Sequence, residues 1–180
     1  MEDNIELIVT SIKELTKKRR LVYINYEPAF AVYTVELRKF GIKENGAVSK
    51  EAFDTLVDEV LAKRATVRAM ALLKNKDYTR KGLEDKLKEG YYPDRCIEHA
   101  LEYVSRFGYI NDERFAENYV NFKAGNKPRR QIELKLKQKG VDADIISRVC
   151  DEFYEDNSDI ELEPVSYTHL TLPTNREVEI

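Results

Sequence analysis

The chain has 180 residues, of which 42% are hydrophobic and 35% charged, with seven glycines and five prolines. This composition is too apolar for a wholly disordered chain and too poor in glycine and proline for a fibrous one. No apolar run approaches the ~18 residues of a membrane-spanning helix, and the acidic start lacks the pattern of a secretion signal. Cys96 and Cys150 fit no zinc or redox spacing. We therefore expect a cytoplasmic protein with reduced cysteines.

The net charge of −3 conceals an uneven distribution of charge along the chain. Residues 63–139 hold 19 Lys or Arg against 11 Asp or Glu, a net charge of +8. Residues 140–163 hold one basic and nine acidic residues, a net charge of −8. A basic block favours an anionic partner, such as nucleic acid or an acidic protein surface. The alternative interpretation is an ordinary solvated helical surface with mixed charges.

Residues 1–62 are predicted to form a small N-terminal module of short strands followed by helix. Gly41 is suited to a left-handed helix end, and Ser49 is suited to cap the helix that follows it. From there to about residue 154 the apolar spacing is helical throughout. Two or three short strands are expected where β-branched and aromatic residues gather, at 8–10, 21–26 and 30–35.

The C-terminal segment 155–180 is predicted to be an acidic, disordered tail. Its residues 165–174, VSYTHLTLPT, resemble the translation of a sequencing-library adapter. We therefore interpret residues 165–180 as an assembly scar and exclude them from the fold. An ordinary disordered C-terminus is the alternative interpretation.

The helical region repeats after 49 residues. In both copies, four apolar residues follow the spacing i, i+3, i+4, i+7 of a buried helix face. They are Ile97, Ala100, Leu101 and Val104 in the first copy, and Ile146, Val149, Cys150 and Phe153 in the second. Four basic residues also coincide, Arg80 with Arg129, Lys81 with Arg130, Lys86 with Lys135, and Lys88 with Lys137.

Each copy is predicted to be a unit of three helices, the first over residues 63–110 and the second over residues 111–154. One such unit has a thin core, so we expect neighbouring units to share apolar surface. The predicted fold class is therefore mainly α, with tandem three-helix repeats and a small β-containing N-terminal module. The helices are expected at 65–75, 79–89, 93–105, 112–124, 128–138 and 142–154.

The second helix of each unit carries the candidate binding residues. Arginine at a helix start can meet phosphate or carboxylate with two parallel hydrogen bonds. Because these helices offer mostly Lys and Arg, they favour contact with phosphates or an acidic surface over readout of bases. Leu83, Leu87, Ile132 and Leu136 are predicted to point inward. The candidate basic face comprises Arg80, Lys81, Lys86, Lys88, Arg129, Arg130, Lys135, Lys137 and Lys139.

Other residues whose side chains could bind a metal or a base are more simply explained by structural roles. His99 has no second ligand nearby in its helix, so a surface histidine is favoured over a metal ligand. We identify no catalytic residue, metal ligand or cofactor site in the sequence. Aromatic residues of the helical region are predicted to pack in the core rather than to stack on bases, with Tyr23, Tyr91 and Tyr109 as the exceptions to test. The aromatic residues considered in the helical region are Tyr91, Tyr92, Phe107, Tyr109, Phe115, Tyr119 and Phe122.

Four motifs follow one another along the chain: RRLVYINYEPAFAVYTVELRKFGIKENGAVS at 19–49, DYTRKGLEDKLKEGYY at 77–92, FGYINDERFAENYV at 107–120 and NKPRRQIELKLKQKGV at 126–141. Together and in this order they resemble the RecX family, the bacterial regulatory proteins of the RecA recombinase. The resemblance covers residues 4–154. It implies an elongated, curved molecule that binds along the groove of the RecA–DNA filament and inhibits its ATPase and strand exchange. It places the protein in recombination, DNA repair and the SOS response, with no catalytic residues or cofactors.

The resemblance also implies a departure from the family. Family members usually carry a third three-helix unit, and this chain turns acidic and adapter-like after the second. We therefore expect a truncated gene product.

Two classes of function remain open at this point. A non-enzymatic filament regulator predicts a monomer that binds single- or double-stranded DNA weakly, without sequence preference and with strong salt dependence. A helix-turn-helix transcriptional repressor predicts a dimer that inserts a helix into the major groove of a defined operator. For the regulator, we hypothesise that both basic helices line one concave side.

Overall fold

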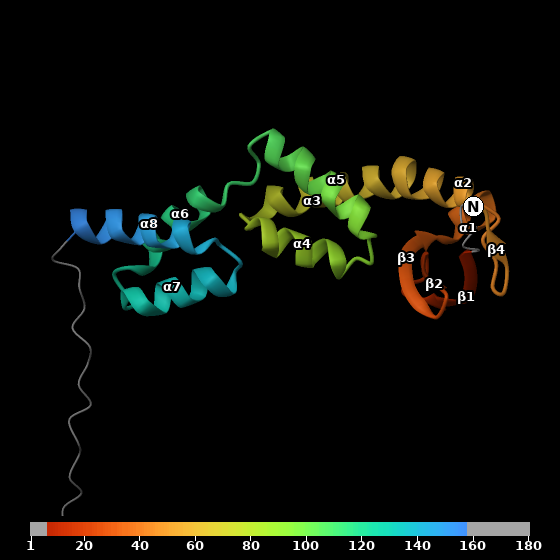
Figure 1. Ribbon diagram of the computed structural model, residues 1–180, viewed down its shortest axis with the longest axis horizontal. Helices are drawn as coiled ribbons and strands as arrows, with labels where there is room; N and C mark the ends of the chain where they lie inside the picture. The colour runs from red at the N-terminus through yellow and green to blue at the C-terminus, as the bar shows by residue number, and fades with distance from the viewer. Residues whose placement is uncertain (1–6, 158–180) are drawn as a thin grey trace, which may run out of the picture.

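The computed structural model describes residues 7–157. Figure 1 shows an elongated molecule with a small sheet at one end and two groups of helices beyond it. The strands are β1 (Leu7–Glu14), β2 (Arg19–Ile24), β3 (Glu27–Tyr33) and β4 (Ala47–Val48). The helices are α1 (Thr34–Lys39), α2 (Lys50–Thr55), the π-helix η1 (Leu56–Leu61), α3 (Ala62–Asn75), α4 (Arg80–Lys88), α5 (Asp94–Arg106), α6 (Asp112–Lys123), α7 (Arg129–Gln138) and α8 (Ala143–Asp156).

The predicted fold class is confirmed, since the chain is mostly helical with a small N-terminal strand module. The predicted tail is described only as far as residue 157, so the adapter-like segment lies outside the described residues.

The N-terminal sheet is antiparallel, with the strand order β3-β2-β1-β4. The prediction of a strand through Val35 is wrong, because α1 begins at Thr34. The Glu36 carboxylate accepts a 2.8 Å hydrogen bond from the backbone N–H of Tyr33, which fixes the start of that helix. β4 was not predicted, because two residues are too few to show an alternating pattern.

A continuous helical stretch of α2, η1 and α3 links the sheet to the rest of the molecule. Ser49 caps it as predicted, with its Oγ accepting a 3.2 Å hydrogen bond from the backbone N–H of Ala52. The stretch passes without a break through residues 62 and 63, where the boundary of the N-terminal module was placed. The sheet and α3 are therefore joined by helix rather than by a loop.

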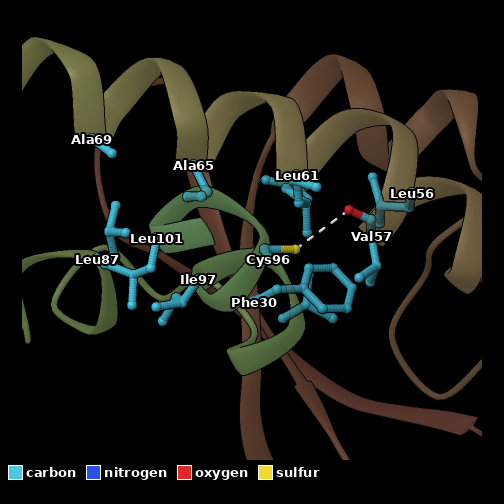
Figure 2. Close-up of a cluster of buried hydrophobic side chains, with 14 of the residues drawn as sticks. Phe30, Leu56, Val57, Leu61, Ala65, Ala69, Leu87, Cys96, Ile97 and Leu101 are labelled. Atoms are coloured by element: carbon cyan, nitrogen blue, oxygen red, sulfur yellow. Dashed lines mark hydrogen bonds between the residues drawn. The ribbon is translucent and has the colours of Figure 1, made fainter. Parts of the chain in front are cut away.

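The structure contains two hydrophobic cores, and the first combines the sheet with α3, α4 and α5. Figure 2 shows Phe30 from β3 against Leu56 and Val57 of η1 and against Cys96 of α5. The thiol of Cys96 donates a 3.3 Å hydrogen bond to the carbonyl of Val57. Phe30 and Leu56 are fully buried. Burial of such large apolar side chains supplies the main stabilisation of this half of the molecule.

The second core belongs to α6, α7 and α8 and does not merge with the first. Its buried residues include Ile132, Leu136, Val149 and Cys150. The expectation that the two units share apolar surface is therefore wrong. The first unit instead buries its apolar face against the sheet, which leaves a polar junction between the units.

The loop that ends each basic helix attaches its unit to the module before it. Arg19 of β2 donates a 2.8 Å hydrogen bond from its guanidinium to the carbonyl of Gly90. At the equivalent position, 49 residues later, the carbonyl of Lys139 accepts a 2.6 Å hydrogen bond from the hydroxyl of Thr79. The backbone N–H of Arg80 donates to the Asp112 carboxylate at 2.8 Å. The repeat seen in the sequence thus recurs in how the modules are attached.

Candidate functional site

The two basic helices, α4 and α7, lie along the same long edge of the molecule, the lower edge in Figure 1. The contact between Thr79 and Lys139 brings the C-terminal end of α7 to the N-terminal end of α4. The partial negative end of one helix dipole therefore meets the partial positive end of the other. This arrangement makes one continuous edge from two helices that are far apart in sequence.

The inward residues of both helices were predicted correctly. Leu83 and Leu87 of α4 are fully buried, as are Ile132 and Leu136 of α7. Because these pairs fix the rotation of each helix, the remaining positions are turned toward the surface.

The lysines of α4 are engaged with acidic residues of the same segment. Lys81 Nζ lies 2.9 Å from Asp85 Oδ1, and Lys88 Nζ lies 2.7 Å from Glu84 Oε1. Lys86 Nζ lies 2.7 Å from a Glu89 oxygen. These hydrogen bonds raise the pKa of each lysine. Exposed pairs of this kind are weak, but they reduce the net positive charge that α4 presents to a partner.

The first arginine of each basic helix is tied to the third helix of its own unit. Arg80 Nη2 lies 2.7 Å from Glu98 Oε1 on α5. Arg129 Nε lies 2.7 Å from Glu133 Oε1, and its Nη2 pairs with Asp151 on α8. The hydrogen bonds to Glu133 and Asp151 raise the pKa of Arg129. Arg129 was predicted to face water; its side chain is instead only 35% exposed and holds α7 against α8.

Arg130 and Lys137 are the cations of α7 whose side chains are engaged neither by an acid nor by another polar group of the described residues. No ion pair or hydrogen bond of either side chain occurs within residues 7–157. Both line a cavity of about 420 Å³ between α7 and α8, together with Leu134 and Ile146. Leu134 is 54% exposed and lies between the two cations on one face of α7. The equivalent residue in α4 is Asp85, so the two helices differ at the centre of this face.

Leu134 was not singled out from the sequence. The available signal was an apolar residue at a position that the helical period turns outward. We name Arg130, Leu134 and Lys137 together the α7 face.

The two remaining candidates at the end of α7 make weaker contacts. Lys135 donates a 2.9 Å hydrogen bond to the side chain of Gln138. Lys139 Nζ lies 5.6 Å and 5.9 Å from the ring centroids of Phe115 and Tyr119. Neither contact involves an acid, so each lysine lacks a carboxylate partner in the part of the chain that the structure describes.

Two of the aromatic residues predicted to pack in the core are exposed. Phe122 is 74% exposed and Phe107 is 56% exposed. The ring of Phe107 lies between those of Tyr103 and Tyr109, with centroid separations of 4.8 and 6.3 Å. The prediction is wrong for these two because both follow the last buried position of their helices, Val104 and Val120. Phe115 and Tyr119 are half-buried and stacked, in line with packing.

The cysteines and the histidine of the helical region lie in different environments. Cys96 and Cys150 are buried, and burial raises the pKa of each thiol to about 11. His99 is exposed, with Nδ1 3.5 Å from the hydroxyl of Thr66. Within the described part of the chain, no group of three or more His, Cys, Asp or Glu residues is placed to hold a metal ion. Nor does any helix between residues 7 and 157 have the length and apolar character needed to cross a membrane.

Comparison with known proteins agrees with this architecture. The sequence model of a family described as "RecX, second three-helix domain" matches residues 111–149, which cover α6, α7 and half of α8. The regulatory protein RecX of Caldanaerobacter subterraneus subsp. tengcongensis is 31% identical over 157 residues, covering 87% of this chain and 80% of that protein. The chain belongs to the RecX family. The RecX of Clostridium acetobutylicum is 26% identical over 159 residues, covering 87% of this chain and 73% of that one.

Solved RecX structures share the fold. The crystal structure of a regulatory protein RecX matches with a TM-score of 0.54 and 21% identity, covering 87% of this chain and 78% of that chain. The crystal structure of RecX from Lactobacillus salivarius matches with a TM-score of 0.51 and 27% identity, covering 54% of this chain and 64% of that chain. The resemblance to RecX seen in the sequence motifs is thus confirmed over most of the chain.

Proposed function

We propose that this RecX-family protein is a non-enzymatic regulator of recombination and DNA repair that acts in the cytoplasm. As a monomer it binds the RecA–DNA filament and inhibits ATP hydrolysis and strand exchange. The observation that carries the proposal is the α7 face, where two cations that have no acidic partner within residues 7–157 flank an exposed leucine.

The chemistry of the α7 face suits an acidic protein surface. Arg130 and Lys137 provide the attraction to carboxylates or phosphates. Leu134 provides an apolar contact, which stabilises binding to a protein surface but not to a phosphate group. A filament of recombinase on DNA offers both kinds of anion along its groove. DNA alone is then expected to bind weakly and without sequence preference, because the face has no side chains arranged to read base edges.

The elongated shape suggests how binding inhibits the filament. α4 and α7 continue one another along a single edge, so one molecule reaches across more than one position of a helical partner. A rigid bridge of this kind opposes the subunit movements that accompany ATP turnover. The lysines of α4 contribute by exchanging their weak intrahelical carboxylate partners for those of the filament.

The test is DNA-dependent ATP hydrolysis by RecA with increasing concentrations of wild-type and variant protein. We expect the double variant Arg130→Glu/Lys137→Glu to need at least about tenfold more protein for half inhibition, since each reversal replaces attraction by repulsion. The matched control is Lys43→Glu/Lys63→Glu, which changes the net charge equally at two exposed lysines away from the α7 face. We expect the control to stay within about twofold of wild type.

Equal inhibition by the two double variants would contradict the proposal. Arg129 is not part of this test, because its reversal also breaks the ion pairs that hold α7 against α8. Unchanged ATP hydrolysis together with tight binding to one duplex sequence would instead favour the helix-turn-helix repressor.

A further inference from the structure

A second cationic site lies at the seam between the sheet and the first three-helix unit. It is a cavity of about 480 Å³, near where the end of α4 approaches β3 in Figure 1. Its walls carry four cations and one acid, Glu89. The cations and the two tyrosines that accompany them are Arg19, Arg64, Arg68, Lys86, Tyr33 and Tyr92. Only Lys86 belongs to the basic face predicted from the sequence.

Arg64 lines this cavity and also has an unused hydrogen-bond donor that is closed to solvent. Its Nη2 pairs with Glu36, and its guanidinium lies 4.5 Å from the ring centroid of Tyr33. These contacts fix the plane of the guanidinium. Its Nη1 atom is buried and has no hydrogen-bond partner within the described residues. A buried donor without an acceptor is costly, and the fold bears this cost to hold the Arg64 guanidinium at the cavity wall.

Arg68 adds a cation that no acid between residues 7 and 157 neutralises. It is exposed on α3, one helical turn after Arg64, and no ion pair or hydrogen bond of its side chain occurs among residues 7–157. Tyr92 marks the convergence of these groups. Burial raises the pKa of its hydroxyl, and the nearby charges of Arg19, Arg64 and Arg68 oppose that rise. Arg19, Arg64 and Arg68 thus line the same cavity as Tyr92.

We infer that this cavity binds a backbone phosphate of single-stranded nucleic acid, with the attached nucleotide against the tyrosine-lined wall. Guanidinium groups bind phosphate through paired hydrogen bonds, which favours it over a simple halide ion. A lone phosphate would leave most of the volume empty, whereas a nucleotide residue fills a cavity of this size. Cations combined with aromatic side chains are typical of single-strand sites. The backbone of a duplex lies on a convex cylinder and reaches only the rim of a recess.

The site depends on both modules, because Arg19 and Tyr33 come from the sheet whereas Arg64, Arg68 and Lys86 come from the helical unit. The cavity is separate from the α7 face, so its binding of nucleic acid can be tested independently of filament inhibition. The N-terminal sheet thereby acquires a role beyond completing the first core.

The test measures fluorescence anisotropy of a labelled thymidine oligonucleotide of about 15 nucleotides, titrated with the full chain at fixed ionic strength. We expect Arg68→Glu to weaken binding by about tenfold and to reduce the steepness of the salt dependence. The matched control is Lys63→Glu, which makes the same charge change at an exposed position on the same helix and should stay within about twofold of wild type. Circular dichroism melting curves verify that both variants fold.

Two further arms identify the ligand. A duplex of the same length should show no difference between Arg68→Glu and Lys63→Glu. Inorganic phosphate exchanged for chloride at constant ionic strength should not displace the oligonucleotide. Equal weakening by both substitutions, an Arg68→Glu effect confined to the duplex, or displacement by inorganic phosphate would each overturn the inference. Since no recombinase is present, none of these results bears on the α7 face.

Discussion

A Cβ atom added to Gly140 would lie 2.3 Å from the Cβ of Lys81, so the loop after α7 rests directly on the first turn of α4. Gly140 also has a φ of +78°, a conformation that side chains with a Cβ rarely adopt. Backbone geometry and close approach therefore both require glycine at the junction between the two units. Because the apolar cores are separate, this small polar junction decides how α4 and α7 are aligned.

We predict that Gly140→Ala destabilises the protein by roughly 2–4 kcal/mol, because it adds a steric clash to backbone strain. Gly108→Ala separates the two effects, since Gly108 has a φ of +69° but nothing within 4 Å of the added Cβ. For Gly108→Ala we expect about 1 kcal/mol. Urea unfolding of the three proteins measures the difference. Equal decreases in the free energy of unfolding for the two variants would show that the Lys81 side chain moves aside without cost.

The hydroxyl of Thr79 is predicted to stabilise the same junction. It accepts a 3.0 Å hydrogen bond from the backbone N–H of Gly82 and donates a 2.6 Å bond to the carbonyl of Lys139, and the residue is only 2% exposed. Thr79→Val keeps the shape but loses both bonds, so we expect destabilisation of about 2 kcal/mol. Thr79→Ser keeps the hydroxyl and should recover most of this loss. Thermal unfolding measures the difference. If Thr79→Val were as stable as wild type and more stable than Thr79→Ser, the stabilising role of the hydroxyl would be contradicted.

The ion pair of Arg129 with Asp151 predicts a dependence of stability on pH. The hydrogen bond from Arg129, followed by one from Ser147, lowers the pKa of Asp151. A carboxyl group with a lowered pKa stabilises the folded state above its unfolded pKa of about 3.9, and this stabilisation is lost as the pH falls through the folded pKa. We therefore expect Asp151→Asn to be less stable than wild type at neutral pH, with a difference that disappears under more acid conditions.

Urea unfolding at a series of pH values measures this difference. The control is Glu152→Gln, an exposed carboxylate on the same helix that forms no ion pair within the described residues. Its difference from wild type should be small at every pH. A gap between Asp151→Asn and wild type that stays constant into the acid range would show that the ion pair does not carry the effect.

Local sequence patterns predicted those features of the fold that depend on residues within one or two helical turns. Ser49 acts as a helix cap, and Leu83 and Ile132 are buried at equivalent points of the two repeats. The predictions of burial were wrong at Phe107 and Phe122, because both residues lie beyond the last position at which their helix is packed against a neighbour.

The motifs and helical periodicity of this sequence determined by themselves the RecX resemblance, the helices, the duplicated unit and the presence of two basic helices. Only the tertiary structure decided that Arg129 is held by Asp151 while Arg130 has no ion pair among the described residues, and that Arg19 and Arg68 border one cavity. Capping and helical spacing act between residues that are close in the chain, so the sequence alone is enough to predict them. Pairing between distant charges depends on how helices and sheet pack, which one sequence does not specify locally.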